Sequence, residues 1–218
     1  FSLSELPELI RRIQANPMLH VRSVFSHLAT ADNPAEDAFT LSQIHCFEEG
    51  SAMIREVFPQ AIRHILNTAG ISRFPQYQFD MVRLGIGLYG VSTCEADKGM
   101  LQPVVSLKTT INQIKRIPAG DSIGYNRHGH AEHDMLIGIV PIGYADGLSR
   151  LLGNDNGKFY VNGHQVPVVG DICMDMCMLD LTDVEAIEGD TVVIFDAEHD
   201  INDVARACQT IPYEIMNS

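Results

Sequence analysis

The chain has 218 residues, of which 45% are hydrophobic and 20% charged, the composition of one large or two ordinary folded domains rather than of a disordered tail. Its 15 Lys and Arg against 28 Asp and Glu give a formal net charge of −13, which disfavours general binding of nucleic acids and docking onto anionic lipid membranes. No segment approaches the ~18 apolar residues of a membrane-spanning helix, and five irregularly spaced cysteines favour reduced thiols and a cytoplasmic location over a disulfide framework.

Helical and extended patterns alternate through the first half of the chain. Apolar residues at helical spacing predict helices over residues 4–13 and 41–57, and apolar runs predict strands over residues 21–28, 64–67 and 81–90. Such alternation predicts parallel strands covered by helices, with functional side chains at the carboxyl ends of the strands. Only about three of the eight strands of a closed barrel can be assigned. We therefore expect residues 1–96 to be the C-terminal part of a TIM-type (β/α)8 barrel, as in a piece cut from a longer protein.

The second half has a different texture. Alternation at period 2 predicts strands over residues 104–111, 159–161 and 165–169, with Gly- and Asn-rich turns between them. A last strand over residues 191–195 and a short helix over residues 202–208 follow. The expected fold class is thus α/β followed by β. Residues 97–218 would form an antiparallel, β-barrel-like C-terminal domain that is truncated at its end.

Five motifs suggest chemistry, and each has a plainer alternative. Tyr144 lies on a Gly-flanked turn that favours close approach to a ligand, or else its ring fills a groove at a strand end. Arg83, at the head of an apolar strand, is costly to bury without a partner. It would therefore either form a salt bridge or be a fixed cation that contacts a heteroatom of a ligand. The Gly85-x-Gly87-x-x-Gly90 spacing is a weak dinucleotide signal, because no strand-turn-helix with a downstream acidic residue follows.

Two of the five motifs raise the question of a metal. On a strand, Cys173, Asp175 and Cys177 would share a face, but no further ligands stand at standard spacing, so a packed strand is favoured. A cluster of three histidines fits a solvated hairpin tip better than a metal site; these are His128, His130 and His133. No metal site is expected.

Six segments, in this order, resemble the alanine racemases, which are fold-type III pyridoxal-phosphate enzymes with an α/β barrel and a C-terminal β domain. They are SHLATAD (26–32), LNTA (66–69), MVRLGIGLYG (81–90), IGYADG (142–147), CMDM (173–176) and IPYE (211–214). The tyrosine and Cys-Met-Asp segments are specific, and the resemblance covers nearly the whole chain. Residues 124–127 (GYNR) resemble the variant in Bacteroidetes-type racemases, some of which follow a fused cell-wall ligase module.

The resemblance implies a role for each catalytic residue. Tyr144 would be the base on the L-alanine face, hydrogen-bonded by His27, which Arg83 holds. Lowering a phenol pKa from ~10 to ~7 requires about 4 kcal/mol of stabilisation of the phenolate. Arg83 would also face the pyridine nitrogen of pyridoxal 5'-phosphate and keep it unprotonated.

The resemblance also implies binding residues and a partner. Cofactor-binding residues would be Thr68, the backbone of Gly85 and Ile86, Tyr213 and Arg83. Substrate-binding residues would be Met174, Asp175, Asp32 and Tyr125, with Ile211 beside Asp32 in the substrate corridor. Because family members place the β domain over the other subunit's barrel, a head-to-tail homodimer with shared active sites is implied.

The chain departs from the family pattern at several points. The lysine that anchors the cofactor in the family, the carbamylated lysine and about a dozen C-terminal residues fall outside it, so we expect no racemase activity from these 218 residues alone. Thr68 replaces a common Ser. Asp171 stands where many members have Arg, which changes the charge of the corridor.

The function implied is interconversion of L- and D-alanine, supplying D-alanine for peptidoglycan precursors. A broader racemase acting on serine or lysine and a catalytically silent paralogue are the alternatives. A decarboxylase of the same barrel type is disfavoured, because those enzymes lack the Tyr-Ala-Asp-Gly segment.

Overall fold

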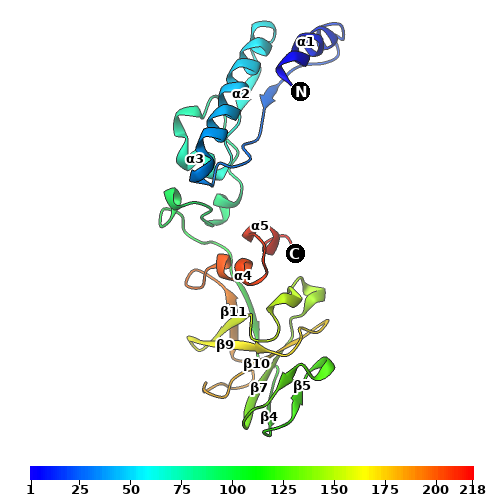
Figure 1. The fold of residues 1–218 in the computed structure, drawn as a ribbon, viewed down its shortest axis with the longest axis vertical. Coiled ribbons are helices and arrows are strands. Elements are labelled where there is room, and N and C mark those ends of the chain that lie inside the picture. The colour runs from blue at the N-terminus through cyan, green and yellow to red at the C-terminus, as the bar shows by residue number, and fades with distance from the viewer. The chain divides into compact units, whose positions relative to one another are not determined.

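The structure is a computed structural model that describes residues 1–218. It divides into two compact units, Phe1–Gln102 and Pro103–Ser218, and we describe each by itself (Figure 1). The expected division into a barrel part (1–96) and a β domain (97–218) stays a prediction. No helix in the structure is long and apolar enough to cross a membrane.

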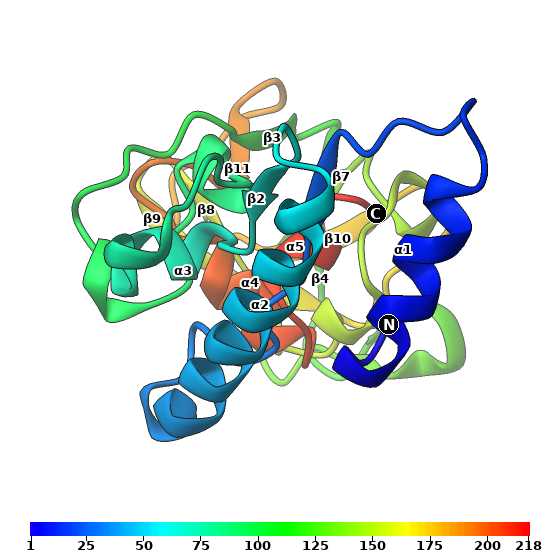
Figure 2. The same ribbon diagram turned by 90° about the horizontal axis from the view of Figure 1, so that it is seen from above.

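The first unit alternates helices with two short strands. Its elements in chain order are α1 (Leu6–Gln14), β1 (Ser23–Phe25), α2 (Asp37–Val57), β2 (Ile62–His64) and α3 (Thr68–Arg73). Asn67 caps α3 by accepting a hydrogen bond from the Gly70 N–H at 3.0 Å, as its residue type favours. α1 and α2 lie side by side (Figure 2), and a Cβ on Gly50 of α2 would come within 3.1 Å of Leu6.

The two strands form a parallel pair in which Ser23 faces Ile62 and Phe25 faces His64. The strand predicted over residues 81–90 is wrong. The backbone runs beside β2, with Asp80 N–H donating to Arg63 O and Arg83 N–H to Leu66 O, and then forms a 3₁₀ helix, Ile86–Tyr89. The hydroxyl of Thr68 accepts the N–H groups of Gly85 and Gly87 at 3.1 and 3.3 Å, so these groups are not available for a strand ladder.

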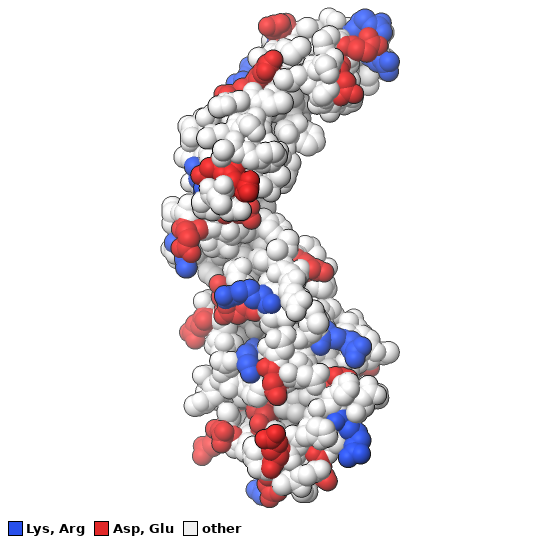
Figure 3. Space-filling view, in the orientation of Figure 1, with Lys and Arg blue, Asp and Glu red and all other residues white.

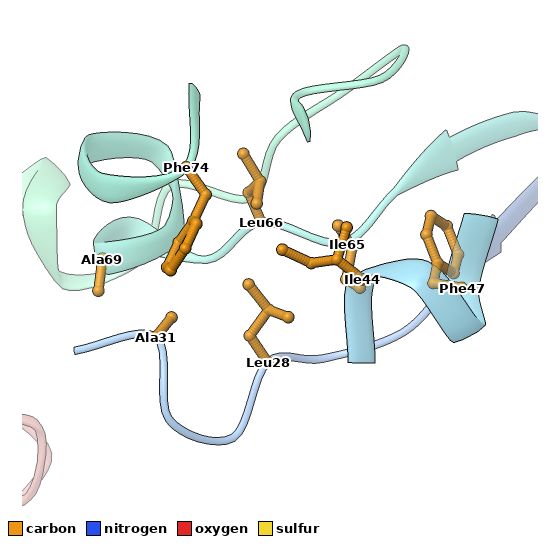
Figure 4. Packing of buried hydrophobic residues seen from close by; sticks show 8 residues of the cluster. All are labelled: Leu28, Ala31, Ile44, Phe47, Ile65, Leu66, Ala69 and Phe74. Atoms are coloured by element: carbon orange, nitrogen blue, oxygen red, sulfur yellow. The ribbon is translucent and has the colours of Figure 1, made fainter. Parts of the chain in front are cut away.

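The core of the first unit lies between the two strands and the helices. Figure 4 shows its eight buried side chains pointing toward one another from β2's end, α2, α3 and the segment after β1. They are Leu28, Ala31, Ile44, Phe47, Ile65, Leu66, Ala69 and Phe74. Burial of the Leu, Ile and Phe side chains among them contributes roughly 1.5–3 kcal/mol each. Ile65 and Leu66 follow directly after β2, and Leu28 lies three residues beyond the end of β1, so the packing also fixes the segments after the strands where His27 and Asn67 lie.

The second unit is built on an antiparallel sheet of seven strands in the order β3-β11-β8-β9-β10-β7-β4. The strands are β3 (Leu107–Thr110), β4 (Gln113–Ile117), β7 (Met135–Val140), β8 (Lys158–Val161), β9 (His164–Val169), β10 (Cys177–Asp180) and β11 (Thr191–Phe195). A separate hairpin pairs β5 (Ser122–Ile123) with β6 (Gly129–His130), and the helices α4 (Ile201–Ala207) and α5 (Pro212–Ile215) end the chain.

The strand patterns of this unit are mostly confirmed. Residues 159–161, 165–169 and 191–195 lie in strands, and residues 104–111 contribute only β3. Asn162 and Gly163, with φ of 50° and 80°, make the two-residue turn between β8 and β9 that this pair of residues favours. Fully buried side chains such as Phe159, Leu179 and Ile194 form the core.

The strand proposed over residues 173–177 begins only at Cys177. The preceding residues turn back, with Cys173 N–H donating to Met176 O at 2.9 Å, so Cys173, Asp175 and Cys177 do not share a strand face. No group of three His, Cys, Asp or Glu side chains is placed to hold a metal ion. On the face shown in Figure 3, Lys and Arg are scattered among Asp and Glu rather than gathered into a basic patch.

Arg73 ties the loop around Asp32 to the two helices beside it. Its Nη2 donates to both carboxylate oxygens of Asp37, at 2.7 and 2.9 Å, and its Nη1 donates to Ala31 O at 2.7 Å. Its side chain is only 12% exposed, against 43% for Asp37, so solvent weakens the pair.

We expect Arg73→Lys to lower the free energy of unfolding by about 1–2 kcal/mol, because a single ammonium nitrogen cannot replace the two guanidinium nitrogens that bind Asp37 and Ala31 O. The urea midpoint measures this, with Arg11→Lys as control. Arg11 also pairs with a carboxylate, but its side chain is 69% exposed. Equal midpoints for the wild type, Arg73→Lys and Arg11→Lys would contradict this stabilising role of Arg73.

Candidate functional site

Arg83 is the centre of the candidate site in the first unit. Its Nη1 lies 2.6 Å from His64 Nδ1 and 3.1 Å from His64 O. Its Nη2 donates to Ser26 O at 2.6 Å and to Ile65 O at 3.1 Å, and lies 3.3 Å from His27 Nδ1. The guanidinium therefore fastens the ends of β1 and β2 to the segment after Asp80. The alternative in which Arg83 pairs with a carboxylate is not seen among these contacts.

The chemistry of arginine fixes the state of both imidazoles. A guanidinium has donors only, so Nδ1 of His64 and Nδ1 of His27 must be the acceptors in these contacts. Each imidazole is therefore neutral and carries its proton on Nε2. His27 is exposed, so its Nε2–H can donate to a group that enters the site. The Nε–H of Arg83 takes part in none of the five contacts and remains free to donate as well.

His64 is a site residue that the sequence did not identify. It is 6% exposed and stacks on the Phe25 ring with centroids 5.3 Å apart. Burial, and secondly the charge of Arg83, lower the pKa of His64, which keeps it neutral beside the guanidinium. Burial also lowers the pKa of Arg83. In the sequence, His64 stood at the start of the strand predicted over residues 64–67, whereas in the structure it ends β2.

A second feature of this unit is a cradle formed by Thr68 and the 85–87 loop. Besides the two N–H groups that its hydroxyl accepts, Thr68 stands so close that a Cβ on Gly87 would lie 2.7 Å from its Cγ2. Glycine is thus required at position 87. Main-chain N–H groups and a hydroxyl at a turn of this kind suit an anion. Of the predicted cofactor residues, Thr68, Gly85, Ile86 and Arg83 thus lie in one region.

In the second unit, the Tyr144 turn is fastened to the Cys-Met-Asp segment by its backbone. Tyr144 N–H donates to Cys173 O at 3.0 Å and Ala145 N–H to Met174 O at 2.9 Å. A Cβ on Gly143 would lie 2.3 Å from Met174 O, so only glycine permits this approach. Tyr144, Met174 and Asp175 are all exposed, so their side chains are brought together on one exposed surface.

Tyr125 projects from a neighbouring turn and is 69% exposed, against 44% for Tyr144. Its flanking residues Gly124, Asn126 and Arg127 all have left-handed backbone, with φ of 76°, 54° and 57°. Such conformations at non-glycine residues cost about 1–3 kcal/mol each and concentrate at functional sites.

The side chains of the three-histidine motif do not form one cluster: His128 pairs with Asp171 at 3.0 Å, and His130 lies in β6.

The remaining predicted residues lie elsewhere. Asp32 is exposed on the loop held by Arg73, and Tyr213 and Ile211 lie at the start of α5, both exposed. Tyr213 belongs to the second unit, whereas the Thr68 cradle belongs to the first. Joint binding of a phosphate by these two residues therefore stays a prediction.

The His64 environment predicts a pH dependence of stability. Its pKa is lowered in the fold from an unfolded value of about 6.5, so below that pH the unfolded chain binds more protons than the folded one. The stability it contributes is complete above about pH 6.5 and is lost as pH falls through the lowered pKa. We expect His64→Gln to flatten the decline of the urea midpoint below about pH 6.5, with the exposed His133→Gln as control. A decline as steep as that of the wild type would contradict a buried neutral His64.

Three comparisons with known proteins show which family the chain is similar to. Residues 104–218 match the family "Alanine racemase, C-terminal domain", and residues 1–93 match "Alanine racemase, N-terminal domain". The alanine racemase of Clostridium novyi is 39% identical over 218 residues, which are 95% of this chain and 56% of that protein.

Solved structures agree in fold as well as in sequence. The alanine racemase from Streptomyces coelicolor A3(2) has a TM-score of 0.89 at 30% identity, covering 97% of this chain and 58% of that one. That from Bartonella henselae, with covalently bound pyridoxal phosphate, has a TM-score of 0.86 at 31% identity, covering 98% and 58%. The expected fold class is confirmed by these matches, and the chain spans little more than half the length of these relatives. From both family matches and these relatives, this chain belongs to the alanine racemase family.

Proposed function

We propose that the protein is a pyridoxal-phosphate-dependent racemase that interconverts L- and D-alanine in the cytoplasm and supplies D-alanine for peptidoglycan precursors. The observation that carries the proposal is the Arg83 centre, which presents a cation and a neutral imidazole N–H at the carboxyl ends of β1 and β2. Family membership and the exposed Tyr144, whose turn is hydrogen-bonded to the Met174 segment, support it. A broader action on serine or lysine has no specific observation in its favour.

The residues of the first unit fit the cofactor by their donor chemistry. The Thr68 hydroxyl and the backbone N–H of Ile86, with Tyr213, would hold the phosphate, while the Gly85 N–H keeps the Thr68 hydroxyl in place and Gly87 keeps the cradle open. The free Nε–H of Arg83 would hydrogen-bond the ring nitrogen. When bound, pyridoxal phosphate withdraws electrons from the substrate's Cα and so makes the α-proton acidic.

Arg83 would moderate that chemistry. A carboxylate facing a pyridine nitrogen favours its protonation, whereas a guanidinium, which keeps its proton in proteins, leaves the nitrogen unprotonated. Arg83 would thereby keep the bound group a weaker acceptor of electrons, which would favour prompt return of the proton to Cα, as a racemase requires.

Proton movement on the L-alanine face is assigned to a phenol of the second unit. A phenol needs about 4 kcal/mol of phenolate stabilisation to act as a base near neutral pH, and the Nε2–H of His27 is a donor that would supply part of it. The resemblance gives this role to Tyr144. Tyr125 is the second candidate, because the left-handed backbone of Asn126 and Arg127 next to it holds an exposed phenol at a conformational cost.

The second unit would also receive the substrate carboxylate. Met174 and Asp175 lie on the segment that holds the Tyr144 turn, and the Met174 N–H makes no hydrogen bond within the chain. Asp32 and Ile211 would line the substrate corridor. Because the tyrosines and Met174 belong to one unit and Arg83 to the other, a head-to-tail homodimer that shares residues between subunits is the proposed assembly.

The test of the activity is D-alanine formation from L-alanine by the full-length protein with pyridoxal phosphate, followed by chiral chromatography. We expect D-alanine to reach equal amounts with L-alanine, with slower conversion of serine and lysine. Faster conversion of serine or lysine would replace alanine as the substrate. A folded protein that binds the cofactor and racemises none of the three would contradict the proposal and indicate a silent paralogue.

The two tyrosines can be separated by matched variants. The phenylalanine variant of the base should slow reaction of L-alanine by ~10²–10⁴, because it removes the ionisable group and keeps the ring. Tyr144→Phe and Tyr125→Phe are compared, with Tyr160→Phe on β8 as control. The larger loss identifies the base. Wild-type rates for both variants would remove a phenol of this surface from the mechanism.

A further inference from the structure

Asp171 lies at the centre of a polar cluster that the mechanism above does not use. Its side chain is only 8% exposed. Its carboxylate lies 3.0 Å from His128 Nδ1 through both oxygens, accepts from Asn154 Nδ2 at 2.9 Å and lies 3.7 Å from Arg150 Nη2. The His128 hydrogen bond, followed by that of Asn154, lowers the pKa of Asp171. Its position in the sequence suggested a charge in the substrate corridor. In the structure the carboxylate is largely buried and is hydrogen-bonded to neighbouring side chains.

The partners of Asp171 come from separate segments of the second unit. His128 ends the turn that carries Tyr125 and donates its N–H to Tyr125 O at 3.3 Å. Asn154 belongs to the loop before β8, and its N–H donates to Gly170 O at 2.9 Å. Asp171 itself leads into the Cys-Met-Asp segment. One carboxylate therefore joins the Tyr125 turn to the segment that also holds the Tyr144 turn.

The turn needs such an anchor. Asn126 and Arg127 have left-handed backbone at two consecutive non-glycine positions, a conformation that persists only when its surroundings hold it. The Nε–H of Arg127 donates to the hydroxyl of Ser122 in β5 at 3.0 Å, which ties the turn to the hairpin. The contact of His128 with Asp171 ties the turn to the segment that contains Met174.

We propose that Asp171 is a positioning residue that, through His128, fixes the turn carrying Tyr125 relative to Met174 and Tyr144. The inference rests on the proposed function only in that Tyr125 acts on the substrate, as base or as binding group. Asp171 itself does not touch the reacting atoms.

The first test needs no activity. Hydrogen exchange of residues 124–128 is measured by mass spectrometry in the full-length holoenzyme, for wild type and Asp171→Asn. The variant keeps the shape of the side chain and loses its charge, and exchange in this turn should accelerate at least about tenfold. The control is Asp196→Asn, which weakens the pair of Asp196 with His199 at 2.9 Å elsewhere in the unit. Unchanged exchange in Asp171→Asn overturns the inference. If that variant does not fold, His128→Ala removes the same contact from a half-exposed side chain.

The second test is a double-mutant cycle with Tyr125→Phe. A misplaced active group costs up to 10²-fold in rate. We therefore expect Asp171→Asn to change the same kinetic parameter as Tyr125→Phe, either lowering kcat or raising KM, by at least about tenfold. If Asp171 acts through Tyr125, the double variant is within about twofold of Tyr125→Phe alone, whereas independent effects multiply. Multiplying effects overturn the inference. A wild-type enzyme without racemase activity contradicts the proposed function, and hydrogen exchange then decides the anchoring alone.

Discussion

The guanidinium of Arg83 has donors and no acceptor, and the candidate site in the first unit depends on that fact. Carbonyl oxygens at the ends of β1 and β2 and two imidazole nitrogens converge on it. A half-buried cation is tolerated because those oxygens and nitrogens replace its water. In return, the cation fixes the tautomer of His27 and His64 and directs an N–H of His27 outward. The positive charge of Arg83, the neutral state of the His27 imidazole and its outward N–H therefore depend on one another.

The second unit depends on close approach of backbones. Gly143 lets the Tyr144 turn contact the carbonyls of Cys173 and Met174, and Gly129 brings β6 to a distance at which a Cβ would lie 2.9 Å from Ile123 O. These contacts hold Tyr144, Met174 and Asp175 on one surface. Asp171 adds a polar contact between that surface and the Tyr125 turn. The positions of the Tyr144 and Tyr125 turns in this unit thus depend on close backbone contacts at glycine and on the buried carboxylate of Asp171.

The sequence predicted those features whose signal is local. Periodicity located α2, β8, β9, β11 and α4, and the cost of burying a cation singled out Arg83. It failed where partners distant in the chain decide the structure. The apolar run over residues 81–90 resembles a strand, but Thr68 takes the N–H groups of its glycines. Cys173 resembles a strand residue, but its carbonyl accepts the N–H of Tyr144, which lies far earlier in the chain.

Two site residues show the same limit. His64 has no spacing that distinguishes it from a core histidine, and its meaning comes only from a contact with Arg83 across 19 residues. Asp171 was visible in the sequence as a departure from the family, which suggested a changed charge in the substrate corridor. Its actual role as a covered acceptor depends on His128, which lies 43 residues earlier. Long-range polar contacts of this kind leave no periodic trace in a single sequence.

The central claim, that Arg83 and His27 serve a phenol that moves the α-proton, is tested most directly by proton exchange. The full-length protein with pyridoxal phosphate is incubated with L-alanine in deuterated water, and loss of the α-proton signal is followed by NMR. The account predicts that deuterium enters Cα of L-alanine while deuterated D-alanine accumulates, and that the two enantiomers end in equal amounts. Absence of deuterium at Cα, in a protein whose absorption spectrum shows bound cofactor, would contradict it.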